Sequence, residues 1–250
     1  MVSGRVPSSG QIVHAAGPTA RVDAGPLRYV NEIGSDGWLQ AKDETTHALI
    51  PLAKYTAVRI VNTYGDRTTF KVADGPQAGK LLSVTTSNAN RYLGTRGPVR
   101  SPAEIEVTYG KYVAQWHSVA RGQDFDEQMA TLKVGGISVQ VTMNTNWGGS
   151  FYPLPPGEYD VLVPDGPHNA NMTHYYRNTY KQLVYDQVWF PVKYNDNNRF
   201  VHIGNVSDGC VTVLDMNQWA AIHEAIISHR SRDGLSVATL IVKGKPERAK

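Results

Sequence analysis

The stretch RFVHIGNVSDGCVTVLD, residues 199–215, holds the one cysteine of the chain, Cys210. His202 precedes it in an apolar run that predicts a short strand, and Gly204-Asn205 predicts a turn after that strand. Cys210 is the candidate nucleophile, because a thiolate attacks carbonyl carbon well. A free thiol is mostly protonated at neutral pH, so the cysteine needs a base, and His202 is the candidate.

Ser207-Asp208-Gly209 stands directly before the cysteine. The glycine lets the backbone bend tightly and turn N–H groups toward a cleft. Amides near Gly209 and Cys210 are therefore candidates for an oxyanion hole. Either His202 takes the proton of Cys210 or the two form a standing thiolate–imidazolium pair, and the sequence leaves both open.

The residues after the cysteine predict a helix and then a closing strand. Asp215 and Gln218 have the spacing of an N-cap and its partner at the third helical position. Leu235–Val242 is a β-branched run typical of a strand. Between these segments, side chains at helical spacing predict one stripe against the core: Trp219, Ile222, His223, Ile226 and Ile227.

This order of strand, histidine, turn, cysteine, helix and strand resembles the catalytic core of the L,D-transpeptidase (YkuD-like) family. The family pattern is a histidine and then Ser-His-Gly-Cys-x-Arg; here His202 is followed by Ser-Asp-Gly-Cys at residues 207–210. Pro155–Val161 looks like the family's Pro-x-Gly-x-aromatic-x-apolar strand. The short loop between histidine and cysteine is most similar to the compact branch that includes secreted antibacterial effectors targeting peptidoglycan.

The resemblance implies a cysteine acyltransferase or peptidase that acts on peptidoglycan stem peptides through a Cys210 thioester, without a cofactor. Transpeptidation and hydrolysis both remain open. Two residues depart from the family, since Asp208 replaces the usual histidine and Thr212 the usual arginine. The first bears on how the thiolate is stabilised, and the second removes a cation that helps to fix the family's site. The resemblance covers roughly the last hundred residues, on the usual scale of a domain.

The composition is that of an ordinary globular protein, and 250 residues suffice for one large domain or two smaller ones. The formal charge of +3 is mild and suits an anionic polymer such as cell wall, among other partners. A single cysteine excludes an intrachain disulfide and a cysteine-rich zinc site. No nucleotide fingerprint and no run of roughly 20 apolar residues is present, so neither a nucleic-acid partner nor a membrane span is expected.

The N-terminus lacks the compact apolar core of a signal peptide. Together with the family resemblance, this predicts a cell-envelope, periplasmic or secreted location that is reached by another route. A secretion-machine or immunity partner is a further expectation.

The predicted fold is mainly β. Residues 1–25 read as a flexible leader, because Gly, Pro, Ser and Ala dominate without a period. Residues 26–100 predict a small all-β module, weakly similar to a bacterial SH3-type barrel. Residues 101–250 predict an antiparallel sandwich or barrel with one helix after the cysteine. Glycines and prolines in residues 93–102 favour a boundary there, although a long surface loop within one domain would carry them too.

Three segments supply candidate substrate contacts. Gly135-Gly136 predicts a hairpin at the start of the catalytic sheet, and Trp147 in the loop after it is either a stacking platform or, more simply, a packing residue. Residues 165–180 predict a loop over the site, with His168, His174 and Tyr176 as polar and aromatic contacts. The spacing of the two histidines fits no common metal-ligand pair, so no metal is expected.

Two other interpretations stay open. In another Cys-His peptidase or amidase, such as a papain-like enzyme, the cysteine normally precedes its histidine, but here His223 and His229 lie in the predicted helix directly after the site. Sortase-like chemistry lacks its arginine here. Alternatively, the chain is a cell-wall or protein-binding β module with an inert Cys210, because Asp208 and Thr212 replace residues expected in the family's site.

Overall fold

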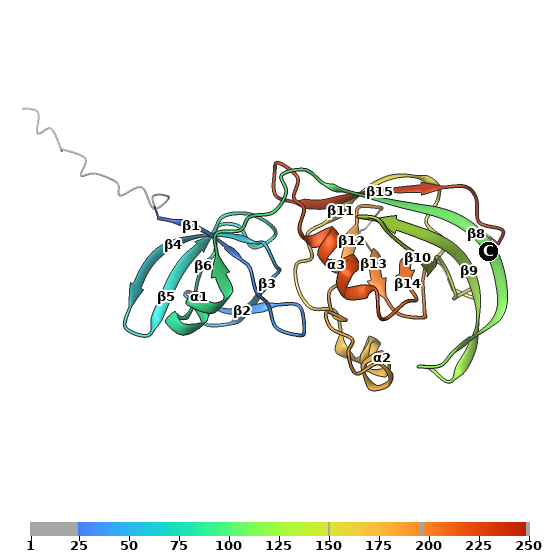
Figure 1. The fold of residues 1–250 in the computed structure, drawn as a ribbon, viewed down its shortest axis with the longest axis horizontal. Coiled ribbons are helices and arrows are strands. Elements are labelled where there is room, and N and C mark those ends of the chain that lie inside the picture. The colour runs from blue at the N-terminus through green and yellow to red at the C-terminus, as the bar shows by residue number, and fades with distance from the viewer. Residues whose placement is uncertain (1–24, 150, 196–197, 249–250) are drawn as a thin grey trace, which may run out of the picture.

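A computed structural model describes residues 25–149, 151–195 and 198–248. The predicted mainly β fold is confirmed, and the strands form two sheets that lie side by side (Figure 1). The predicted leader lies outside the described residues, except for Gly25.

The N-terminal sheet is seven-stranded, in the order β3-β2-β6-β5-β4-β1-β7. A short helix, α1 (Thr86–Tyr92), crosses one end, and its N-cap Thr85 accepts a hydrogen bond from the Asn88 amide. This helix was not predicted, and the similarity to an SH3-type module stays a prediction. The strands are β1 (Leu27–Val30), β2 (Leu39–Asp43), β3 (Leu49–Leu52), β4 (Ala57–Tyr64), β5 (Arg67–Val72), β6 (Leu81–Thr85) and β7 (Leu93–Gly94).

The C-terminal sheet is a closed barrel in the order β10-β14-β13-β12-β11-β15-β8-β9. Most neighbours are antiparallel, as expected, but β13 pairs with β14 and β15 with β8 in parallel. The strands are β8 (Ala103–Ser118), β9 (Gln123–Val134), β10 (Ile137–Thr142), β11 (Gly157–Leu162), β12 (Phe190–Val192), β13 (Arg199–Ile203), β14 (Val211–Val213) and β15 (Ser236–Lys243).

Two helices accompany the barrel. The helix α3 (Trp219–Ile227) follows the cysteine as predicted and buries Trp219, Ile222 and Ile226 completely. It begins later than an Asp215 N-cap requires, because the Asp215 carboxylate instead accepts the Asn217 amide in a turn. The segment over the pocket was expected to be a loop, but it contains the short helix α2 (His174–Thr179) after the 3₁₀ turn η1 (Ala170–Met172).

The two sheets are not only connected by the chain but also pack against each other. The N-terminal sheet has a core of its own, yet Trp38, Ala53 and Tyr55 belong to the core of the barrel. Removing such side chains from water is the main stabilising contribution to a contact of this kind. The sheets divide between Gly94 and Ala103, within the predicted boundary segment, while independent domains with a limit at residue 100 stay a prediction.

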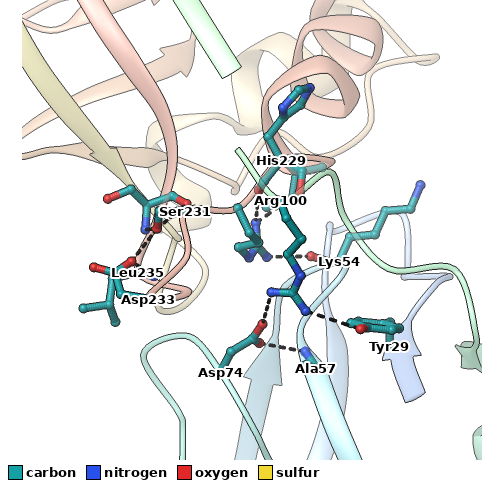
Figure 2. Close-up of polar contacts among 12 residues, drawn as sticks. Tyr29, Lys54, Ala57, Asp74, Arg100, His229, Ser231, Asp233 and Leu235 are labelled. Atoms are coloured by element: carbon teal, nitrogen blue, oxygen red, sulfur yellow. Dashed lines mark hydrogen bonds and ion pairs between the residues drawn. The ribbon is translucent and has the colours of Figure 1, made fainter. Parts of the chain in front are cut away.

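Charged groups lie where the two sheets meet (Figure 2). Arg230 is fully buried and donates through Nη2 to the Lys54 carbonyl at 2.9 Å. Asp74 accepts the Ala57 amide at 2.7 Å and lies 3.9 Å from the Arg100 guanidinium. We call this set, together with the Lys54–Glu224 ion pair at 2.8 Å, the seam.

Candidate functional site

His202 and Cys210 line the same pocket. His202 is in β13 opposite Thr212 of β14, and Cys210 comes directly before β14. The parallel pairing therefore makes the cysteine a diagonal neighbour of the histidine. The pocket has a volume of about 340 Å³ and is lined by Arg121, Phe151, His168, Met172, Tyr176, Trp189, Asn198, Phe200, His202, Ile203, Gly204, Val206, Asp208 and Cys210.

Both ring nitrogens of His202 have partners. Nδ1 lies 2.9 Å from the Ile203 carbonyl oxygen, and because a carbonyl only accepts, Nδ1 carries the proton. Nε2 is then the acceptor, and the Thr212 hydroxyl donates to it at 3.0 Å. The Ile203 carbonyl therefore leaves Nε2 as the nitrogen of His202 that can take a proton, and the hydroxyl of Thr212, which stands where the resemblance expects arginine, contacts that nitrogen.

An aromatic stack holds the ring in place. Trp189 lies parallel to His202 at 3.8 Å between ring centroids, and His168 stacks on Trp189 at 3.5 Å. Burial lowers the pKa of His202 to about 3, opposed by its bond to the Ile203 carbonyl. His202 is therefore a neutral base at physiological pH.

The thiol of Cys210 is also neutral at rest. The residue is 6% exposed, and burial raises its thiol pKa to about 11, although the Phe200 amide and the Arg199 guanidinium act in the opposite direction. Within the described residues, no hydrogen bond joins the sulfur to the His202 ring. Both groups are therefore neutral and do not form a standing thiolate–imidazolium pair, while proton transfer during attack stays a prediction.

A buried cation, Arg199, lies near Cys210. It is buried in β13, and its charge lowers the thiol pKa of Cys210. A Cβ on Gly209 would lie 2.7 Å from Arg199 Nε, so the guanidinium packs directly against the turn before the cysteine. Arg199 begins the stretch of residues 199–215 that holds the cysteine, but the sequence alone indicates no role for it.

The turn before the cysteine is fixed by side chains and by close packing. Ser207 is buried, and its hydroxyl donates to the Cys210 carbonyl at 2.9 Å. Gly209 has φ +79°, and a Cβ there would meet the Tyr152 carbonyl oxygen at 2.2 Å, so only glycine fits. The Gly209 amide donates to no other group within the described part of the chain. Asp208 lines the pocket, and its charge raises the thiol pKa.

The predicted substrate contacts divide into two pairs. His168 and Tyr176 line the pocket, and the Tyr176 hydroxyl accepts the Asn205 amide at 2.9 Å. His174 is exposed on α2, where its ring lies against Tyr175.

Trp147 lies outside the pocket lining as well. Its indole N–H donates to the Asp126 carbonyl at 2.8 Å, and its ring packs against Tyr112 and the Arg248 guanidinium. Trp147 thus packs against neighbouring side chains in this structure, and its role as a substrate-stacking platform stays a prediction.

Sequence reasoning missed several lining residues, of which Trp189 and Arg121 matter most. The aromatic character of Trp189 is the one signal in the sequence that could have singled it out. Arg121 carries no such signal, and its guanidinium lies over the Tyr175 ring at 4.3 Å.

No protein-family model, curated protein or solved structure matches this chain. The L,D-transpeptidase resemblance therefore stays a prediction that depends on the residues quoted for it. Among the described residues, no group of three or more His, Cys, Asp or Glu side chains is arranged to hold a metal ion. In the same residues, no helix combines the length and apolar character needed to cross a membrane.

Proposed function

We propose that the chain performs cysteine-dependent acyl transfer or hydrolysis on peptidoglycan stem peptides through a Cys210 thioester. The observation that carries the proposal is that a thiol and a neutral imidazole of fixed tautomer line one pocket. The peptidoglycan substrate follows from the family resemblance. The corresponding location is the cell envelope, the periplasm or the outside of the cell, with a secretion-machine or immunity partner.

The proposed reaction begins when substrate enters and the sulfur comes within reach of His202. Catalytic hydrogen bonds are often long without substrate and tighten in the complex. The S–H bond breaks and His202 Nε2 takes the proton, while the sulfur bonds to the substrate carbonyl carbon and the carbonyl electron pair moves to oxygen. On collapse the C–N bond breaks, and the leaving amine takes the proton from Nε2. An amine or water then attacks the thioester, which regenerates Cys210.

The negative oxygen requires donors placed in advance. The Gly209 amide, without an acceptor in the described residues, is the first candidate, and the buried Arg199 guanidinium packs against the same glycine. Losing one such donor typically lowers a rate by about 10²-fold or more. The turn that only glycine can form is thus the proposed oxyanion site.

Two further hollows share the lining residue Phe200 with the pocket. One has a volume of about 290 Å³, and the other, of about 540 Å³, extends to Pro76 in the loop between β5 and β6. We propose that an extended peptide lies along them. Asp160, Asp165 and Asp233 line these hollows and outnumber Lys193, which pairs with Asp160 at 3.4 Å, so the lining carries a net negative charge. A peptide with a free ammonium group, such as a diaminopimelate-type residue, complements their charge.

Purified muropeptides test the proposal. The wild-type chain should convert tetrapeptide muropeptides to shortened, exchanged or crosslinked products that mass spectrometry resolves, and Cys210→Ser should give none. Adding an amine acceptor separates transfer from hydrolysis, because only a transferase incorporates it. Tetrapeptides left unchanged under all these conditions would exclude the proposal.

A second candidate is a cell-wall or protein-binding module with an inert cysteine. The burial of Cys210 and the absence of a sulfur–imidazole hydrogen bond in the described residues favour it. Alkylation by iodoacetamide across pH separates the two. A His202-assisted thiol loses rate in His202→Ala, whereas an inert buried thiol reacts equally slowly in both proteins.

A further inference from the structure

The turn that joins β8 to β9 brings an arginine to the pocket. The two strands form a hairpin, and residues 119–122 make its end. Arg121, in this end, lines the pocket that also holds Cys210. Figure 1 shows the end of the hairpin next to α2, and the Arg121 guanidinium lies 4.3 Å from the centre of the Tyr175 ring of that helix. The proposed reaction gives this cation no role.

Hydrogen bonds between buried groups hold the end of the hairpin in place. Ser118 is fully buried, and its hydroxyl donates to Asn205 Oδ1 at 2.7 Å and accepts the Arg121 amide at 3.2 Å. Asn205 is buried in the turn after β13, and its amide donates to the Tyr176 hydroxyl of α2 at 2.9 Å. Hydrogen bonds thus join the hairpin, the turn after β13 and α2. A group held in place in this way loses less freedom when it binds a ligand.

Within the described residues, the Arg121 guanidinium forms no ion pair with a carboxylate. Of the acidic side chains close to it in sequence, Asp124 pairs with a histidine ring of β8 at 2.7 Å and Asp126 pairs with Arg248 at 3.5 Å. Asp208 lines the same pocket, two residues before the cysteine, and it too forms no ion pair with Arg121 in this part of the chain. A guanidinium that lies over an aromatic ring keeps the N–H donors of its edge for a carboxylate.

The charges around the pocket favour one direction for a bound peptide. The two hollows with a net negative lining share Phe200 with the pocket, and Arg121 lines neither of them. Complementary charges fix the orientation of a charged ligand. The pocket volume of about 340 Å³ is at the small end of the range of about 300–1,000 Å³ for ligand pockets, so it suits the end of a peptide better than a chain that continues.

We propose that Arg121 is a specificity-determining residue that binds the free α-carboxylate of the last residue of the peptide. This inference rests on the proposed function and deepens it. The bond that breaks is then the one before the last residue, and the leaving amine has a free carboxylate beside it. A carboxamide at the same position presents no negative charge to the guanidinium and binds more weakly.

Two stem tetrapeptides test the proposal with the full wild-type chain. They are identical except that one ends in a free carboxylate and the other in a carboxamide. The value of kcat/KM should be at least about tenfold higher for the carboxylate, the effect expected of a charge-assisted hydrogen bond. Most of the difference should lie in KM, because the contact exists both before and during the reaction.

Three variants assign the preference to one side chain. Arg121→Gln should lower kcat/KM for the carboxylate about tenfold and change the value for the carboxamide little. Arg121→Lys should restore part of the loss, because an ammonium keeps the charge but lacks the fork. Lys111→Gln is the matched control, since it removes a positive charge from an exposed position of the same hairpin outside the pocket lining. It should keep the wild-type preference.

The outcomes separate this proposal from the proposed function. Equal kcat/KM values for the two peptides in wild type, or an Arg121→Gln variant that keeps the full preference, overturn the role of Arg121 and leave the proposed function standing. A wild-type chain that converts neither peptide overturns the proposed function, and the role of Arg121 with it. The first comparison needs only the wild-type chain, so the test does not depend on whether a variant folds.

Discussion

The pocket and the seam both bury ionisable groups, but they treat them differently. In the seam, Glu224 accepts hydrogen bonds from Lys54 and Tyr55, and Asp74 faces the Arg100 guanidinium. In the pocket, burial makes both the Cys210 thiol and the His202 ring neutral, although the Arg199 charge acts on the thiol in the opposite direction. The seam thus joins two sheets through charged groups, whereas in the pocket both ionisable groups are neutral.

The largest expected effect comes from removing the thiol. Cys210→Ser should lower muropeptide turnover by about 10³-fold or more, because a serine hydroxyl is a far weaker nucleophile than a cysteine thiol. The melting temperature should change little, since the substitution is nearly isosteric. Residual turnover within tenfold of wild type would show that Cys210 is not the nucleophile.

Arg230→Ala tests the seam, and here stability should change while the reactivity of Cys210 should not. Three carbonyl groups accept from this buried guanidinium, and its loss also leaves Asp74 with less compensation. We expect a loss of about 3 kcal/mol in the free energy of unfolding, measured in urea, with little change in the rate of Cys210 alkylation. The exposed Arg232→Ala is the control and should stay within about 0.5 kcal/mol of wild type.

Acid should destabilise the chain through its buried neutral histidines. Burial lowers the pKa values of His202 and His223 to about 3, against 6.5 for the ordinary side chain. Between those values the unfolded chain binds a proton at each site and the native chain does not, so stability is lost as pH falls from about 6.5 toward 3. His223→Leu should reduce the slope by about 1.4 kcal/mol per pH unit, and an unchanged slope would contradict the assignment.

The raised pKa of the buried Glu127 changes stability with pH in the opposite direction. Its folded pKa of about 7 lies above the ordinary value of 4.5, so the native chain holds a proton that the unfolded chain has lost. Its contribution is present below pH 4.5 and is lost as pH rises through about 7. Stability of wild type relative to Glu127→Gln should therefore decline across this range in urea titrations, and a flat difference would contradict the raised pKa.

The smallest effect is expected from Tyr55→Phe in the seam. It removes one hydrogen bond of 2.6 Å to Glu224, while Lys54 continues to pair with that carboxylate. A loss of about 1 kcal/mol in unfolding free energy is expected, with no change in turnover. A loss of turnover without a loss of stability would mean that the seam and the pocket are coupled.

Local patterns predicted much of the barrel. Gly135-Gly136 forms the expected hairpin turn, with Ile137 paired to Val134, and the helix after the cysteine lies where the sequence indicates it. These two features depend on backbone preferences and on the spacing of apolar residues within one segment, whereas the strand at Gly157–Leu162 was expected from the family resemblance. Such signals are readable without knowledge of the fold.

The remaining features depend on contacts between distant segments. The parallel pairing of β13 with β14 decides that His202 meets Thr212 first and Cys210 only diagonally. The stack of Trp189 on His202 and the approach of Glu127 to Thr142 likewise join segments that are separate in sequence. The pKa shifts follow from burial, which a sequence pattern does not measure.

Intact-mass spectrometry of the chain mixed with tetrapeptide muropeptide tests the central claim most directly. The account predicts an added acyl mass that peptide mapping assigns to Cys210, that accumulates more slowly in His202→Ala, and that is absent from Cys210→Ser. A chain whose mass stays unchanged while the muropeptide is converted, or an adduct that forms equally well without His202, would contradict it.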